Sequence, residues 1–144
     1  MQHDKYDSEN LKAILKSIKV IALTGASPNP ARPSYGVMAF LLERGYKVIP
    51  VNPGQAGKQI LGQTVYATLA DIPEPFDMVD VFRASEYLEN VVDEAIALVP
   101  HPKVIWAQLG VYDAAAAAKA EAVGMQVVMN RCPAIEYPRL IGSS

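Results

Sequence analysis

The chain has 144 residues, of which 51% are hydrophobic and 19% charged, a composition that can bury one apolar core and is unlike that of disordered or disulfide-held chains. Its formal net charge of -2 disfavours general nucleic-acid binding, because such proteins present a basic surface to the phosphates. The one cysteine, Cys132, excludes an intramolecular disulfide, and no apolar run approaches the ~18 residues that a membrane helix needs. We therefore expect a single domain over residues 1–144 that works in the cytoplasm, with no nucleic acid and no membrane as partner.

Patterns typical of strands and helices alternate along the chain. The expected strands are short runs of branched apolar residues, and the expected helices carry apolar residues spaced by three and four. In the first half, the expected elements are a helix over about residues 8–17 with Ser8 as its N-cap, a strand over 19–24, a proline-rich loop over 25–33, a helix over 34–44 and a strand over 47–51. In the second half, they are a loop over 55–63, a very short strand at 65–66, a short helix over 68–72, a strand over 76–82, a helix over 86–99, a strand over 103–107, a helix over 112–123, a strand over 126–129 and a mostly irregular tail over 130–144.

Strands that are apolar on both faces need helices on both sides of the sheet. The alternation therefore predicts an α/β fold, a three-layer domain with a mostly parallel, doubly wound sheet. In such sheets, ligands bind beyond the carboxyl ends of the strands, where the strand order reverses. The loops in which to look for function are those over residues 25–33, 52–63, 83–85, 108–111 and 130–133.

The loop after the first strand has features of a phosphate-binding loop. It opens with Gly25, carries the hydroxyl of Ser27 and leads to Ser34 at the start of a helix. A helix N-terminus offers unpaired N–H groups and a partial positive charge to an anion. The dinucleotide fingerprint would need glycines at positions 27 and 30, where Ser27 and Pro30 stand. The loop therefore indicates a phosphate site of a general kind, with a plain strand-to-helix turn as the competing interpretation.

The end of the second strand carries no acid. Proteins that bind NAD place an Asp or Glu there for the ribose hydroxyls, whereas this chain has Asn52 and Pro53. A nucleotide with a phosphate on its ribose favours such a neutral or basic neighbourhood, and Arg32, Lys58 and Arg83 all lie in the loops at this edge. Either NADP or coenzyme A (CoA) fits this pattern.

Catalytic groups are scarce. His3 lies in the N-terminal tail, and His101 precedes a strand, at the wrong end of the sheet for these loops. The sequence thus offers no Ser–His or Cys–His pair and no metal site. Cys132 lies in a loop at the carboxyl edge, beside Arg131, where it is either a buried structural thiol or a reactive one.

Six motifs together resemble the stand-alone CoA-binding domain family, which is similar to the N-terminal domain of the succinyl-CoA synthetase alpha subunit. Their order and spacing are more specific than any one of them, and they extend from about Leu11 to Glu136. The motifs are Val20–Ser27, Arg32–Val37, Gly45–Pro53, Val79–Arg83, Trp106–Val111 and Asn130–Pro133.

The resemblance implies a Rossmann-like fold with CoA lying across the carboxyl edge of the sheet. The residues that it assigns to CoA are Gly25, Ala26, Ser27, Arg32 and Ser34 at the pyrophosphate, with Tyr35 in the same motif; Asn52, Pro53 and Lys58 on the adenosine side; Phe82 and Arg83 at the adenine or its phosphates; and Gln108 and Gly110 along the pantetheine path. The family often has an acid where this chain has Asn130. We do not expect the ligase activity of the synthetase, because its second domain with a phosphorylated histidine has no counterpart here.

The sequence therefore predicts a CoA- or acyl-CoA-binding protein without an evident catalytic site, acting as a carrier, a sensor or a regulatory module. A first alternative is an NADP-dependent Rossmann oxidoreductase or its remnant. A second is a thiol-redox protein in which Cys132 forms a mixed disulfide with CoA. A homodimer and an unidentified protein partner are both compatible with the sequence.

Overall fold

The computed structural model of the protein describes residues 6–142, so His3 lies outside the described residues. The strands are β1 (Val20–Thr24), β2 (Lys47–Val51), β3 (Gln59–Ile60), β4 (Gln63–Thr64), β5 (Met78–Val81), β6 (Val104–Ala107) and β7 (Gln126–Val128). The α-helices are α1 (Ser8–Ser17), α2 (Pro33–Glu43), α3 (Leu88–Ile96), α4 (Ala114–Ala122) and α5 (Pro133–Leu140). Three 3-10 turns are η1 (Pro53–Gln55), η2 (Leu69–Asp71) and η3 (Ser85–Tyr87).

The main sheet is parallel and doubly wound, as the alternation of elements predicts. Within the described residues it has five strands in the order β2-β1-β5-β6-β7, and every pairing in it is parallel. From β1 the chain crosses to β2 on one side and then returns to β5 on the other side. The strand order therefore reverses between β1 and β5. Pro50 fits in β2 because β2 is an edge strand of this sheet, where a missing N–H is tolerated.

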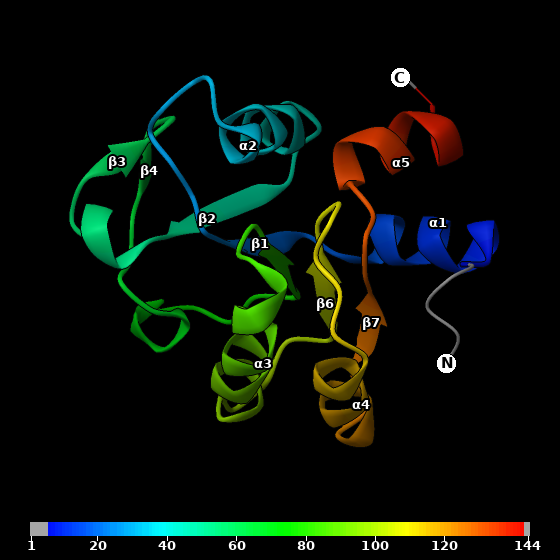
Figure 1. Ribbon diagram of the computed structural model, residues 1–144. Coiled ribbons are helices and arrows are strands. Elements are labelled where there is room, and N and C mark those ends of the chain that lie inside the picture. Colours follow the sequence, from blue (N-terminus) through cyan, green and yellow to red (C-terminus); the bar gives the residue numbers. More distant parts are fainter. Residues whose placement is uncertain (1–5, 143–144) are drawn as a thin grey trace.

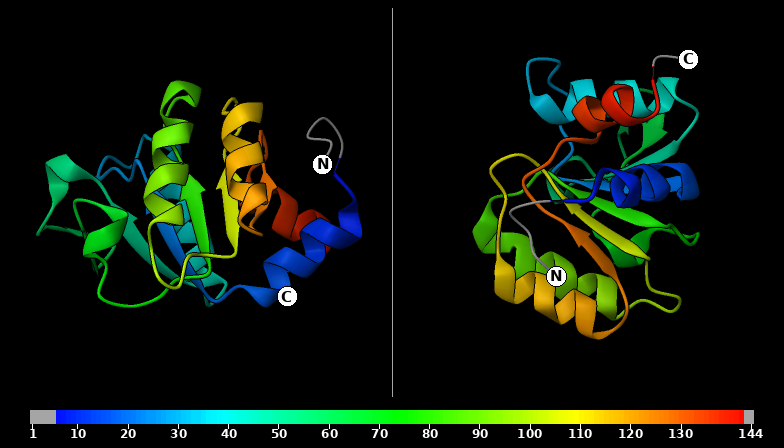
Figure 2. Two further views of the ribbon diagram at one scale, coloured as in Figure 1. Left: turned by 90° about the horizontal axis from the view of Figure 1, so that it is seen from below. Right: turned by 90° about the vertical axis from the view of Figure 1, so that its right-hand side faces the viewer.

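Helices cover both faces of the sheet (Figure 1). One apolar cluster joins the sheet to α1, α2 and α5, and a second joins it to α3 and α4. In β1, Ile21 and Leu23 belong to the first cluster and Ala22 to the second. Figure 2 shows α3 and α4 side by side beneath the sheet. Because both faces are buried, the strands are apolar throughout rather than alternating with polar residues.

The C-terminal segment differs from its prediction. Residues 130–144 were expected to be mostly irregular, and this was wrong over α5, which spans Pro133–Leu140. Pro133 occupies the first helical turn, where its missing N–H costs nothing. The ring of Tyr137 packs edge-on against Phe40 at 5.9 Å and Tyr46 at 6.2 Å between centroids. Tertiary packing therefore stabilises this helix, although its two prolines lead the sequence pattern to predict irregular structure.

Two smaller details also depart from the sequence pattern. Helix α1 is capped by Asp7 rather than by Ser8, since the Asp7 carboxylate accepts a hydrogen bond from Glu9 N at 3.0 Å. The segment expected to be a loop over residues 55–63 starts at the last residue of η1 and contains the strand β3, which pairs with β4 as an antiparallel hairpin. Tyr66 forms an isolated parallel bridge with Val51. Across residues 6–142, no helix has the length and apolarity needed to cross a membrane.

Candidate functional site

The candidate site lies where the strand order reverses, at the carboxyl ends of β1 and β5. The two loops that leave these strands touch at Gly25. This glycine has a φ of 76°, and a Cβ placed on it would lie 2.6 Å from the carbonyl oxygen of Phe82. Only glycine combines this conformation with so close an approach of two backbones. The position therefore joins the loop after β1 to the loop after β5.

A first cavity, of about 360 Å³, opens between the β1 loop and the start of α2. Its lining residues are Gly25, Ala26, Ser27, Arg32, Pro33, Ser34, Asn52 and Phe82. Seven of these eight are residues that the sequence assigned to the ligand. The N-cap of α2 is Arg32, which makes no side-chain capping hydrogen bond. The first turn of the helix therefore presents N–H dipoles and a guanidinium to this cavity.

The β1 loop is held in place by its neighbours. The N–H groups of Gly25 and Ala26 donate to the Val51 carbonyl at 3.1 and 3.3 Å. The amide of Asn52 donates to the Ala26 carbonyl at 2.7 Å and accepts from Gly54 N at 2.8 Å. Gly25 and Ala26 thus shape the cavity rather than offering it free backbone donors. The groups left to meet an anion come from Ser27, Arg32 and the start of α2.

A second cavity, of about 240 Å³, adjoins the first at the end of β2. It is lined by Thr24, Gly25, Val51, Asn52, Pro53, Ala67, Thr68, Leu69, Arg83 and Glu94. The hydroxyl oxygen of Thr24 is buried and has no hydrogen-bond partner among residues 6–142. The Arg83 guanidinium lies over the Tyr87 ring, 4.6 Å from its centroid. The cavity therefore combines an unpaired polar oxygen with a positioned cation.

A third cavity, of about 480 Å³, adjoins the first at Pro33 and Phe82 and the second at Arg83. Its lining residues are Pro33, Val37, Phe82, Arg83, Ala84, Gln108, Leu109, Gly110, Val111 and Cys132. Most of these side chains are apolar. Arg83 and Gln108 are the polar exceptions. Gln108 is 6% exposed, and its Oε1 atom has no hydrogen-bond partner in the described part of the chain. A buried carbonyl oxygen of this kind favours a ligand with an N–H or O–H donor.

Hydrogen bonds between loops fix one wall of the third cavity. Gly110 N donates to Asn130 Oδ1 at 2.7 Å, and the Ser85 hydroxyl donates to the Gly110 carbonyl at 3.3 Å. The same hydroxyl accepts a hydrogen bond from Tyr112 N at 2.9 Å. Asn130 has a φ of 57°, a left-handed conformation that asparagine tolerates better than most residues. Asn130 therefore supports the loop around Gly110.

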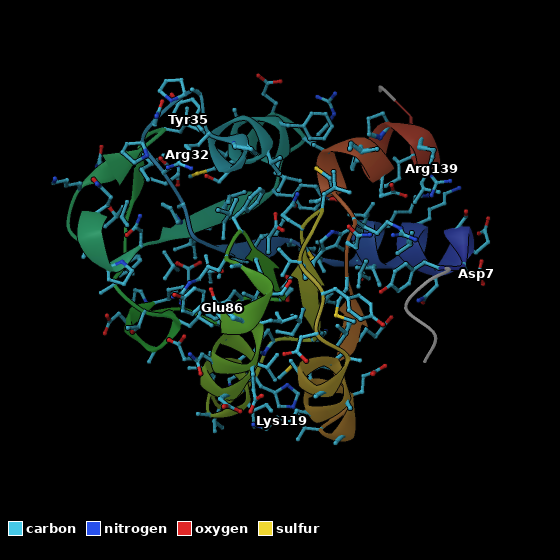
Figure 3. The ribbon with its side chains drawn as sticks, viewed as in Figure 1. Asp7, Arg32, Tyr35, Glu86, Lys119 and Arg139 are labelled. Carbon is cyan, nitrogen blue, oxygen red and sulfur yellow. The ribbon has the colours of Figure 1, made fainter. Side chains whose placement is uncertain are left out.

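Two of the predicted ligand residues lie apart from the three cavities. Neither Tyr35 nor Lys58 is among the residues that line them in the described chain. Tyr35 is half-buried and packs against the core beneath α2, and Figure 3 shows it next to Arg32 at the start of that helix. Lys58 is exposed, between η1 and the β3–β4 hairpin. The other eleven predicted residues line at least one cavity.

Sequence reasoning missed several lining residues. Val37 and Val111 look like ordinary core residues in the sequence, because an apolar side chain that lines a cavity has the same pattern as one that fills a core. Thr68 was missed for a different reason. It follows Tyr66, whose bridge with Val51 brings the next residues to the carboxyl edge. The rule that ligands lie beyond strand ends, applied to that very short strand, would have found it.

Asp80 is a buried carboxyl group that the sequence did not assign to the site. It sits in the middle of β5 between Leu23 and Trp106, is fully buried, and neither of its oxygens has a partner among the described residues. Burial raises the pKa of Asp80 well above its ordinary value, because the charged form loses its hydration. Asp80 lies in the interior of the sheet and lines none of the three cavities.

Comparisons with known proteins point to one family. The family described as "CoA binding domain" matches residues 19–138. An uncharacterized protein of Bacillus subtilis (strain 168), YneT, is 37% identical over 122 residues, which is 85% of this chain and 87% of that protein. A solved structure of a hypothetical protein from Pyrococcus horikoshii OT3 superposes with a TM-score of 0.89 at 38% identity, covering 99% of this chain and 97% of that one. The alpha subunit of an ADP-forming acetate–CoA ligase from Pyrococcus furiosus is 32% identical over 80 residues, 53% of this chain but 17% of the subunit.

Proposed function

The chain belongs to the CoA-binding domain family, and we propose that it binds CoA or an acyl-CoA along the carboxyl edge of its sheet. The observation that carries the proposal is that three cavities adjoin one another at this edge of the sheet. The first cavity shares Gly25 and Asn52 with the second and Pro33 and Phe82 with the third, and Arg83 lines both the second and the third. CoA has the matching plan, with a pyrophosphate between a nucleoside at one end and the pantetheine arm at the other.

The first cavity suits the pyrophosphate. A helix N-terminus carries about half a positive charge and is a common site for phosphate groups. Here α2 begins without a side-chain cap, beside the exposed guanidinium of Arg32 and the hydroxyl of Ser34. These groups offer positive charge and donors at a point of a chain whose formal net charge is -2. An anion therefore has a local reason to bind there.

The second cavity suits the adenosine part. It contains Arg83, whose cation can pair with a phosphate on the ribose, and the unpaired Thr24 hydroxyl. No acid follows β2, where Asn52 and Pro53 stand, so a ribose phosphate meets no repulsion from that position. These features support a phosphorylated nucleotide and are compatible with both CoA and NADP.

The third cavity favours CoA over NADP. Its walls are mainly apolar, from side chains such as Val37, Phe82 and Val111. The pantetheine arm is a narrow, largely apolar chain with two amide N–H groups, and Gln108 Oε1 is a buried acceptor without a partner among residues 6–142. A nicotinamide riboside would bring several more polar groups into the same apolar space, at a cost for each one left unpaired.

The role that follows is binding without chemistry of the protein's own, as a carrier, a sensor or a regulatory module. Among residues 6–142, the carboxyl edge brings together no nucleophile–base pair, since His101 lies before β6, at the opposite end of the sheet, with Nδ1 2.8 Å from the Pro102 carbonyl. The ligase relative is much longer than the matched segment. We therefore propose the binding function and leave the ligase reaction to that relative.

Calorimetric titration with CoA, acetyl-CoA, NADP and NAD tests the proposal. We expect saturable binding of CoA compounds, and we expect Arg32→Ala to weaken it about ten-fold or more, because a charge-assisted contact contributes about 1.5–3 kcal/mol. Lys103→Ala is the matched control. It removes the same charge from the opposite end of the sheet, where Lys103 is exposed before β6, and should leave affinity unchanged. Binding of NADP with none of CoA would contradict the proposal.

A further inference from the structure

Cys132 stands in the wall of the third cavity. It is 6% exposed, caps the start of α5 and lines the cavity together with Gln108, Val37 and Phe82. It is also the one cysteine of the chain. Its backbone is fixed, because its carbonyl accepts hydrogen bonds from Ile135 N at 3.0 Å and Glu136 N at 2.9 Å. The backbone that carries the thiol is therefore held in place beside a mainly apolar cavity.

A second observation marks this space as a ligand site. Gln108 is more than nine-tenths buried, lines the same cavity and has an Oε1 atom without a hydrogen-bond partner in the described part of the chain. Unpaired buried oxygens are rare in folded proteins, because each one loses its hydrogen bonds to water. A pantetheine amide is a donor that would satisfy it. Cys132 and the unpaired Gln108 oxygen thus face the arm of CoA that ends in a thiol.

We propose that Cys132 captures oxidised CoA as a mixed disulfide. The inference rests on the proposed CoA-binding function and adds a covalent step to it. The Cys132 thiol loses its proton to solvent, and its sulfur attacks one sulfur of CoA disulfide. The disulfide bond of the reagent breaks, a bond forms between Cys132 Sγ and one CoA sulfur, and the other CoA leaves as a thiolate that takes up a proton. No further oxidant is required, because CoA disulfide is itself the oxidant: its oxidised sulfur becomes part of the new disulfide while the other CoA leaves reduced.

Recognition of the nucleotide part makes the capture selective. A bound CoA disulfide keeps one of its sulfurs close to Cys132, so the exchange becomes effectively intramolecular. Glutathione disulfide carries no nucleotide and must react by random encounter with a nearly buried thiol. We therefore expect the CoA adduct to form at least about ten-fold faster at equal reagent concentration. Free thiols should reverse it.

Intact-mass spectrometry of the full chain is the test. We expect one CoA adduct with CoA disulfide, slower modification by glutathione disulfide, and release of the adduct by dithiothreitol. Because the chain has one cysteine, the wild-type adduct locates the site even if a variant fails to fold. Cys132→Ser should abolish the adduct while still binding reduced CoA by calorimetry. Arg32→Ala should slow the CoA adduct, and Lys103→Ala, at the opposite end of the sheet, should leave its rate unchanged.

The outcomes separate the two proposals. If reduced CoA binds but CoA disulfide gives no adduct, covalent capture is refuted and the binding function stands. Equal rates with the two disulfides would also refute it, since the site would then contribute nothing. If neither reduced CoA nor CoA disulfide binds, the proposed function itself fails.

Discussion

Replacing Gly25 by alanine should damage both the fold and the site. The variant meets two costs, which the structure separates. The first is the backbone, because a φ of 76° places an alanine in the left-handed region at roughly 1–2 kcal/mol. The second is contact, because the new Cβ would lie 2.6 Å from the Phe82 carbonyl oxygen and 2.9 Å from its carbon. These are backbone atoms, which cannot rotate away, so overpacking adds roughly 1–3 kcal/mol.

The free energy of unfolding should therefore fall by roughly 2–5 kcal/mol, measured by urea denaturation with an unchanged dependence on urea. Two other glycines serve as controls. Gly62 has a φ of 78° and nothing within 4 Å of an added Cβ, so Gly62→Ala should show the backbone cost alone. Gly36 lies within α2 with open space around it, so Gly36→Ala should stabilise by up to about 1 kcal/mol.

The difference between the stability losses of Gly25→Ala and Gly62→Ala isolates the contact of the added Cβ with Phe82. If Gly25→Ala costs no more than Gly62→Ala, the close approach of the β1 loop to Phe82 does not hold the site together. A larger loss with weakened CoA binding would agree with the junction that Gly25 forms between the two loops.

Two further predictions concern polar groups, one buried and one exposed. The pKa of Asp80 is raised in the folded state by burial. The wild-type free energy of unfolding should therefore fall, as pH rises above the unfolded pKa, by up to about 1.4 kcal/mol per pH unit. Urea denaturation at several pH values should show that Asp80→Asn lacks this pH dependence, and the same slope in both proteins would refute the prediction. Asn130→Ala removes the exposed hydrogen bond from Gly110 N, whose net contribution is about 0.5–1.5 kcal/mol, and puts alanine at a φ of 57°, so it should cost roughly 1–3 kcal/mol in the same assay. Asn130→Asp keeps the acceptor and should stay near wild type, and an equal loss in both variants would contradict the hydrogen-bond argument.

Much of the site could be predicted because its position depends on topology. Short apolar strands alternating with helices determine a doubly wound sheet, and the reversal between β1 and β5 determines which loops meet. Gly25, Arg32 and Ser34 could then be placed at one edge from the sequence alone.

What the sequence could not show depends on contacts between distant residues. Helix α5 is stabilised by the packing of Tyr137 against Phe40 and Tyr46, which no local pattern reveals. The N–H groups of Gly25 and Ala26 look free in the sequence, yet both donate to the Val51 carbonyl from another strand. The path of residues 55–63 carries Lys58 to an exposed position outside the lining of the three cavities described here.

Mapping CoA onto the backbone amides by NMR titration is the most direct test of where this chain binds its ligand. We expect saturable chemical-shift changes of the amides in the loops at the carboxyl edge, at Ser27, Ser34 and Gly110. Little change is expected at Lys103 and Gln126 on the opposite edge. The second cavity at Thr24 should respond to CoA and less to pantetheine alone. No saturable change at millimolar CoA, or changes confined to the opposite edge, would contradict it.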